Sequence, residues 1–232
     1  MPAIRPFRAL KYDPAVAGDI QDLVAPPYDI IFDAWRDRLY ERNPYNIIRL
    51  IKTKDEALPG EQPDKYARAA ESLTDWMKRG VLRLDNRPAI YVCADTFVSA
   101  DRKYTRIGFI ALVHIEEFGH GIHPHERTLS GPKVDRLNLV KATGTNLSQI
   151  FGIYQDPGMV VGNILRGVMA KAPDVDFTDE LEVGRRMWTV TNRTTINAIV
   201  NFMRDRDIII ADGHHRYETA MAYRESMESS RT

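Results

Sequence analysis

Apolar side chains recur at intervals of three and four residues between positions 64 and 80. These positions are Tyr66, Ala69, Ala70, Leu73, Trp76 and Met77. The spacing predicts an amphipathic helix with Trp76 and Met77 in a core, and Gly80 follows where such a helix ends. Patterns of the same kind predict helices at 159–171 and 196–203. Ser130 near a cap position and a proline in the first turn predict a helix at 132–141, and 214–226 is the last predicted helix.

Short apolar runs rich in β-branched residues predict strands elsewhere. Residues 89–94 and 106–115 are two such runs, and the polar link at 99–103 suits an antiparallel hairpin. Further strands are predicted at 46–51, 174–177, 187–191 and 207–211. Pro26 and Pro27 hold their segment as a rigid loop. Short strands mixed with helices predict an α+β, or mixed α/β, fold that is β-rich in its N-terminal part.

The composition is that of an ordinary globular protein of 232 residues, 44% of them hydrophobic. The 32 basic side chains equal the 32 acidic ones, so no overall charge attracts nucleic acid or an anionic membrane. No stretch approaches the ~20 apolar residues of a membrane span. The single cysteine, Cys93, excludes an internal disulfide. We therefore expect a cytoplasmic protein that does not bind membranes, and its oligomeric state is open.

The turn between the last predicted strand and the last predicted helix carries the strongest chemical signal. Gly213 permits a tight turn after Asp212, and the helix begins with His214, His215 and Arg216. A helix N-terminus already carries about half a positive charge, so a cation there costs ~0.3–1 kcal/mol. A bound anion removes this conflict, because backbone N–H groups, the guanidinium and the imidazoles can all donate to it. This strand-turn-helix segment therefore predicts a phosphate site.

Two other interpretations of the same turn stay open. In the first, Asp212 caps the helix, Arg216 pairs with a carboxylate and both histidines face solvent. In the second, one of these histidines binds a metal ion together with His123 and His125. Pro124 lies between those two residues and disfavours the regular strand that would place both rings on one face.

A second group of polar side chains lies in the loop at 119–131 and in the helix after it. The group comprises His125, Glu126, Arg127, Thr128, Lys133, Asp135 and Arg136. Phosphoryl transfer needs a base, cations that neutralise the oxygens and a ligand for magnesium. Glu126 fits the base and Lys133 fits a cation at the transferred phosphate. Asp212 and Asp135 fit magnesium, because their carboxylates supply oxygen ligands.

The remaining members of this group suit the binding of a substrate. The residues predicted to bind it are His125, Arg127, Thr128 and Arg136, together with Tyr28 from the proline loop. Ordinary structural roles explain the same residues. Charged side chains of a solvated loop pair with their neighbours, and a rigid turn by itself accounts for Tyr28.

Five segments resemble the family known as domain of unknown function 1015, and they are spread over most of the chain. They are Arg5-Pro6-Phe7-Arg8-Ala9, Val24-Ala25-Pro26-Pro27-Tyr28-Asp29, Asn43-Pro44-Tyr45, His125-Glu126-Arg127-Thr128, and the run from Ala211 to Ala220. Members of that family are considerably longer than this chain. The resemblance therefore implies a natural protein that continues past Thr232.

The core Asp-Gly-His-His-Arg motif is also similar to the nucleotide motif of the ParB and sulfiredoxin superfamily, which includes free L-serine kinases. This similarity implies that Gly213, His215 and Arg216 hold nucleotide phosphates. His214 stands where sulfiredoxins need a cysteine, which excludes reduction of a sulfinic acid. The similarity also implies two domains, an α+β region at 1–155 and a ParB/sulfiredoxin-like segment at 156–232 that is truncated at its C-terminus.

Together these features predict a small-molecule kinase that binds ATP or ADP with Mg²⁺ and phosphorylates free L-serine or a similar hydroxyl metabolite. A different class also fits, namely a nucleotide-responsive regulator or ParB-like clamp without phosphotransfer. A third hypothesis is a zinc-dependent hydrolase with Glu126 as its base. Neutral charge and the lack of a recognisable helix-turn-helix argue against nucleic-acid binding within this chain.

Overall fold

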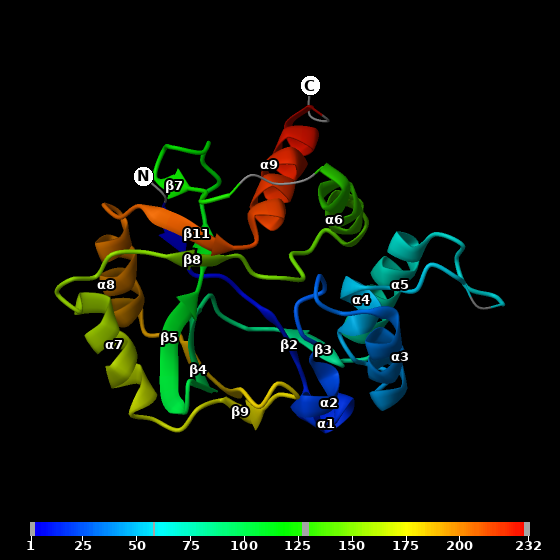
Figure 1. Ribbon diagram of the computed structural model, residues 1–232, viewed down its shortest axis with the longest axis horizontal. Coiled ribbons are helices and arrows are strands. Elements are labelled where there is room, and N and C mark those ends of the chain that lie inside the picture. The colour runs from blue at the N-terminus through cyan, green and yellow to red at the C-terminus, as the bar shows by residue number, and fades with distance from the viewer. Residues whose placement is uncertain (1–2, 58, 127–129, 230–232) are drawn as a thin grey trace. The chain divides into compact units, whose positions relative to one another are not determined.

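The computed structural model describes residues 3–57, 59–126 and 130–229 (Figure 1). The chain folds into two compact units, each assembled from three segments. Unit 1 comprises Met1–Leu10, Leu84–His125 and Gly152–Ala211, and unit 2 comprises Lys11–Arg83, Glu126–Phe151 and Asp212–Thr232. Helices and strands are mixed along the chain, which confirms the α+β fold. The domain boundary at residue 155 stays a prediction, and each unit is described separately below.

A four-stranded antiparallel sheet forms the centre of unit 1. Its strands, in the order β5-β4-β10-β9, are β4 (Ile90–Ser99), β5 (Arg102–Ile110), β9 (Val175–Thr178) and β10 (Gly184–Val190). The predicted hairpin is confirmed, and its turn is tighter than the polar link suggested. Ala100 and Asp101 have φ angles of 47° and 59°. Positive φ at both central residues matches the right-handed twist of the strands.

One face of this sheet is covered by helices α7 (Val160–Met169) and α8 (Arg193–Met203). Val92 pairs with Trp188 across neighbouring strands, so both side chains point to the same face. There they pack with Leu165 of α7 and Ile199 of α8. The helices predicted at 159–171 and 196–203 are confirmed, because their apolar positions recur at the period that this packing requires.

The remaining strands form one three-stranded sheet and two two-stranded sheets. In the order β7-β11-β8, strands β7 (Ile122–His123), β8 (Phe151–Ile153) and β11 (Ile208–Asp212) form a three-stranded sheet in which β11 runs parallel to β7. Two further pairs are β1 (Ile4–Arg5) with β6 (Leu112–Val113), and β2 (Leu10–Tyr12) with β3 (Leu82–Leu84). The segment predicted as a loop at 119–131 thus contains a short strand.

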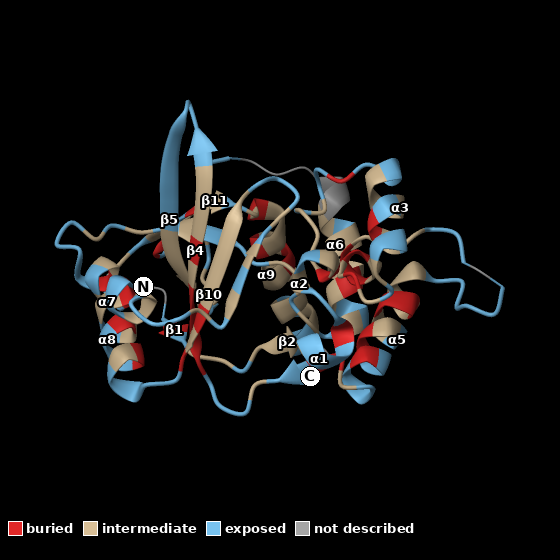
Figure 2. Ribbon diagram, turned by 90° about the horizontal axis from the view of Figure 1, so that it is seen from below, coloured by how far each residue is buried: buried red, intermediate tan, exposed pale blue. Residues whose placement is uncertain are grey.

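Unit 2 is helical. Its helices are α1 (Pro14–Ala17), α2 (Ile20–Leu23), α3 (Asp33–Arg42), α4 (Ile48–Ile51), α5 (Lys65–Lys78), α6 (Ser130–Thr143) and α9 (His214–Ser229). Helix α5 confirms the most regular pattern in the sequence. Asp64 caps it by accepting two backbone N–H bonds, and Gly80 follows it with a φ of 75°. Figure 2 shows buried and exposed residues alternating along α5.

Two predictions about unit 2 were wrong, and one of its helices, α3, was not predicted. Met77 is exposed, while its neighbour Trp76 is buried. The strand predicted at 46–51 is wrong, because the Asn46 side chain accepts the N–H of Ile48 at 2.9 Å and so starts helix α4. Helix α3 has a single buried residue, Leu39, among charged positions and therefore shows no apolar period.

Helices α6 and α9 confirm the predictions at 132–141 and 214–226, and both extend slightly further. They pack against each other within unit 2, side by side in Figure 1. Throughout the part of the chain that the structure describes, none of the helices has both the length and the apolar character needed to cross a bilayer.

Candidate functional site

The turn at Asp212–Arg216 has the geometry that its sequence predicts. Strand β11 passes directly into helix α9 through Gly213, whose φ is +90° (Figure 1). The N–H of Tyr217 donates to the carbonyl of Gly213 at 3.0 Å and makes the first hydrogen bond of the helix. The N–H groups of the three preceding residues therefore belong to the positive end of the helix dipole. No acidic residue occupies the first turn of α9.

Arg216 folds back over this turn. Its guanidinium pairs with the carboxylate of Asp212 and donates to the backbone carbonyl of Gln149. The side chain packs so closely over Gly213 that a Cβ built there would lie 3.0 Å from Arg216 Cζ. Asp212 is largely exposed, so its carboxylate faces solvent although it pairs with Arg216.

His214 connects the turn to the loop that precedes α6. The imidazole is 1% exposed, and its Nδ1 lies 2.9 Å from Oε1 of Glu126. The Glu126 side chain is 56% exposed, so one carboxylate lies against a buried imidazole and still faces solvent. This burial excludes the interpretation in which His214 points to solvent. It also brings together two residues, 88 positions apart, that the sequence analysis singled out separately.

Lys133 adds a cation beside the first turns of α9. Its Nζ lies 2.6 Å from Oε2 of Glu218, and both side chains are partly buried. Lys133 stands near the start of α6, and Glu218 follows Arg216 by two residues on α9. Glu126, Lys133, Asp212, His214 and Arg216 therefore gather in unit 2 around the N-terminal end of α9.

A second polar cluster in unit 2 contains Asp135, Arg136 and Tyr28. The Arg136 guanidinium stacks on the Tyr28 ring with 4.0 Å between Cζ and the ring centroid, and its Nη1 donates to the carbonyl of Ile51 at 2.9 Å. Asp135 accepts from Nε of Arg136 at 2.9 Å and from the hydroxyl of Tyr66 at 2.8 Å. These contacts place three predicted site residues in one cluster.

The electrostatics of this second cluster follow from its packing. Burial alone would raise the pKa of Asp135, but the hydrogen bond and charge of Arg136, with smaller contributions from Tyr66 and Lys65, outweigh it and lower that pKa. Asp135 is therefore an anion whose oxygens are already bound. As a magnesium ligand it would first have to release these partners, whereas the exposed carboxylate of Asp212 would exchange only one guanidinium.

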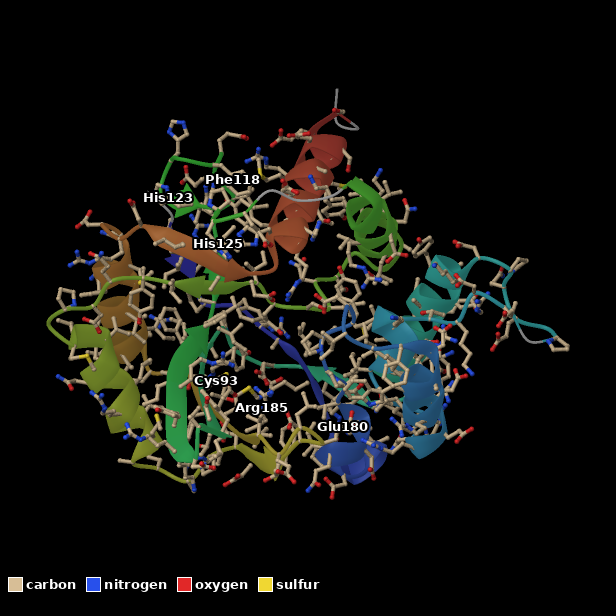
Figure 3. All side chains as sticks on the ribbon, viewed as in Figure 1. Cys93, Phe118, His123, His125, Glu180 and Arg185 are labelled. Carbon is tan, nitrogen blue, oxygen red and sulfur yellow. The ribbon has the colours of Figure 1, made fainter. Side chains whose placement is uncertain are left out.

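Two histidines of the loop, His123 and His125, were predicted site residues, and both lie in unit 1. His123 Nε2 is 3.0 Å from Oδ2 of Asp207, and His125 Nδ1 is 2.6 Å from the carbonyl oxygen of Ile210 (Figure 3). These contacts attach the loop to Asp207, directly before β11, and to Ile210 in the middle of that strand. Among the described residues, no three His, Cys, Asp or Glu side chains converge as a metal-binding group. Cys93 lies half-buried on β4, and burial raises the pKa of its thiol to about 12, which makes it a poor nucleophile.

The family model described as protein of unknown function (DUF1015) matches residues 4–232. The chain belongs to the DUF1015 family. No curated protein matches it, and no solved structure does. The resemblance deduced from the five sequence segments is thereby confirmed over residues 4–232, while the similarity to the ParB and sulfiredoxin superfamily stays a hypothesis.

Two residues of this DUF1015 protein that were predicted to bind the substrate, Arg127 and Thr128, lie outside the residues that the structure describes. Sequence reasoning also missed side chains that the fold brings to Asp135 and Arg136. These side chains come from α3, the C-terminal end of α4 and the start of α5, and they are Arg36, Lys52, Lys65 and Tyr66. No local motif marks them.

Exchange of Gly213 for alanine is expected to destabilise the DUF1015 protein by about 1–2 kcal/mol, because alanine is strained at positive φ. The added methyl group would also lie 3.0 Å from the Arg216 guanidinium, which would have to shift slightly. Urea unfolding followed by circular dichroism measures the change. Gly167→Ala in helix α7 is the matched control. A Cβ built at Gly167 meets no described atom within 4 Å. Alanine there should stabilise the helix by up to ~1 kcal/mol, because it has the higher helix propensity. Equal changes in the free energy of unfolding at both positions would contradict this account.

Proposed function

We propose that this DUF1015 protein is a nucleotide-binding small-molecule kinase whose phosphate site is the Asp212–Arg216 turn. The observation that carries the proposal is the 2.9 Å contact between Glu126 and His214. It places a solvent-facing carboxylate at a helix start that presents a guanidinium and backbone donors. A base and an anion site within one unit are what phosphoryl transfer to a hydroxyl requires.

The phosphate end of the nucleotide would be held by backbone N–H groups at the start of α9, by the imidazole of His215 and by Arg216. Binding requires the guanidinium to exchange Asp212 for a phosphate oxygen. The Asp212 carboxylate is 58% exposed and is rehydrated when released, while the guanidinium, only 16% exposed, exchanges one anionic partner for another and is never left uncompensated. Lys133 lies close enough to the same helix to neutralise charge on the transferred group, since its partner Glu218 is on the first turns of α9.

The exchange leaves the Asp212 carboxylate available to a cation. An oxygen ligand at a strand end, exposed and next to the phosphate site, suits Mg²⁺, which usually binds one or two carboxylates together with substrate phosphates. Mg²⁺ bound there would shield the charge of the phosphate oxygens. Asp212 thus has two states, paired with Arg216 or bound to the cation.

Glu126 would accept the proton of the acceptor hydroxyl. His214 is buried and its Nδ1 lies 2.9 Å from one oxygen of this carboxylate, which keeps the carboxylate beside the helix start without removing it from solvent. The acceptor, free L-serine or a similar hydroxyl metabolite, would be held by Tyr28 and Arg136 of the second cluster. The substrate roles of His125, Arg127 and Thr128 are further predictions.

The proposal extends to the fold of the C-terminal segment. The Asp-Gly-His-His-Arg turn between β11 and α9 supports a ParB/sulfiredoxin-like arrangement at 156–232, since that superfamily places nucleotide phosphates on such a turn.

The direct test incubates the protein with ATP or ADP, magnesium and a panel of hydroxyl-bearing amino acids, and measures phosphorylated product by mass spectrometry. Nucleotide affinity is measured in parallel by calorimetry. We expect both binding and product. Tight nucleotide binding without product would favour a nucleotide-responsive regulator, and absence of both would refute the kinase. Zinc analysis of protein purified without added metal tests the hydrolase hypothesis independently.

A further inference from the structure

Unit 2 contains a cavity of about 330 Å³ that the phosphate site does not include. It lies among the start of α3, helix α4, the first turn of α5 and the first half of α6. The side chains that give it its chemistry are Tyr28, Arg36, Lys52, Lys65, Tyr66 and Arg136. The volume falls within the range of cavities that hold small metabolites.

Four cationic side chains line this cavity. Arg36 and Arg136 are only 13% and 11% exposed. Lys52 is fixed by the backbone carbonyls of Tyr28 and Ile31, and Lys65 pairs with Asp55 at 2.8 Å. Long cationic side chains held this firmly lose little further entropy when they bind a ligand.

The balance of charges leaves the cavity positive. Four basic side chains line it against three acidic ones, Asp33, Asp55 and Asp135. Asp33 and Asp55 are largely exposed, so water screens them more strongly than it screens the guanidinium groups of Arg36 and Arg136. An anionic group is therefore favoured beside these two guanidinium groups.

The guanidinium groups also have donors to spare. A guanidinium carries five N–H donors. Within the described residues, Arg136 donates to Asp135 and to the carbonyl of Ile51, and Arg36 pairs with Asp33 and Asp37. Several N–H groups of both residues therefore remain for a ligand oxygen.

We propose that this cavity binds a small organic acid, with its carboxylate or phosphate-ester oxygens on Arg36, Lys65 and Arg136 and its remainder between Tyr28 and Tyr66. Binding of the acid does not depend on kinase activity. The identification of the acid as the phosphate acceptor does rest on the proposed function.

Tyr28 connects this cavity with the phosphate site. Burial raises the pKa of Tyr28, and the positive charges of both Arg136 and Arg216 oppose that rise. One guanidinium lines the cavity and the other belongs to the turn, so both act electrostatically on the ring that lines the cavity.

The test is calorimetric titration without nucleotide, using glycolate, inorganic phosphate and uncharged ethylene glycol as probes. We expect glycolate, phosphate or both to bind and ethylene glycol not to bind. Arg36→Gln and Lys65→Gln should each raise the Kd about tenfold or more, because each removes a charge-assisted hydrogen bond. Arg38→Gln and Lys78→Gln, exposed positions on the same two helices, should leave the Kd unchanged.

The outcomes separate this proposal from the kinase. Glycolate binding that depends on Arg36 and Lys65 identifies a carboxylate site, and phosphate binding with the same dependence identifies a phosphate-ester site. Binding lost only in Arg216→Ala would place the anion at the turn and overturn the cavity proposal, as would no binding of either anion. The kinase fails instead if nucleotide binding and product are absent while the acid still binds.

Discussion

Glutamine in place of Glu126 is expected to lower the rate of phosphate transfer by about 10²–10⁴-fold, the usual contribution of a general base. The glutamine amide keeps the size of the side chain and can still contact His214, but it cannot accept a proton from the acceptor hydroxyl. Initial rates of product formation at saturating nucleotide measure the effect. Nucleotide affinity should stay within the error of calorimetry, because Glu126 is proposed to act on the acceptor.

The matched control is Glu71→Gln, an exposed glutamate on helix α5. It should have the wild-type rate and stability. A Glu126→Gln variant with an unchanged rate would show that the base lies elsewhere. A loss of nucleotide affinity in that variant would instead indicate that the carboxylate mainly orients His214 at the phosphate site.

Removal of the Arg216 guanidinium has the second large expected effect. Arg216→Ala should weaken nucleotide binding by about 10–100-fold, since hydrogen bonds to a charged group contribute about 1.5–3 kcal/mol. Arg216→Lys should recover only part of the affinity, because an ammonium group lacks the planar fork that binds two phosphate oxygens. Calorimetric Kd values for ATP and ADP measure both variants.

Arg224→Ala, two turns further along α9, controls for the general loss of a cation from this helix. Its nucleotide affinity should equal that of the wild type. Arg216 also binds Asp212 and the carbonyl of Gln149, so thermal unfolding must show that the Arg216 variants are folded before affinities are compared. Equal affinities of folded Arg216→Ala and wild type would remove the turn from the nucleotide site.

Both variants probe one physical arrangement. Arg216 is neutralised by Asp212, and Glu126 is oriented by His214, so the candidate groups are held in paired form before any ligand arrives. In each pair the carboxylate is exposed and its partner is mostly buried, so the carboxylate can be exchanged for another anion while the partner stays in place. Ligand binding at this turn would therefore be an exchange of ion pairs and not a rearrangement of the fold.

The pattern of neighbouring residues was sufficient to predict those elements whose conformation depends on neighbouring residues. Helix α5 follows from the period of its apolar residues and from its capping Asp64, and the β4–β5 hairpin follows from two β-rich runs with a polar link. The turn at Gly213 is equally local, because a glycine with positive φ between a strand and a helix needs no distant contact. These elements, and the α+β class, could be predicted from sequence order alone.

Contacts between distant segments decided the rest. Helix α4 replaces a predicted strand because Asn46 bonds its own neighbour Ile48 and also the carbonyls of Asp22 and Val24. The meeting of Glu126 with His214, and the cavity that joins Arg36, Lys65 and Arg136, link residues tens of positions apart. Periodicity describes the faces of single elements, whereas a site depends on which faces come together, and only packing in three dimensions determines that.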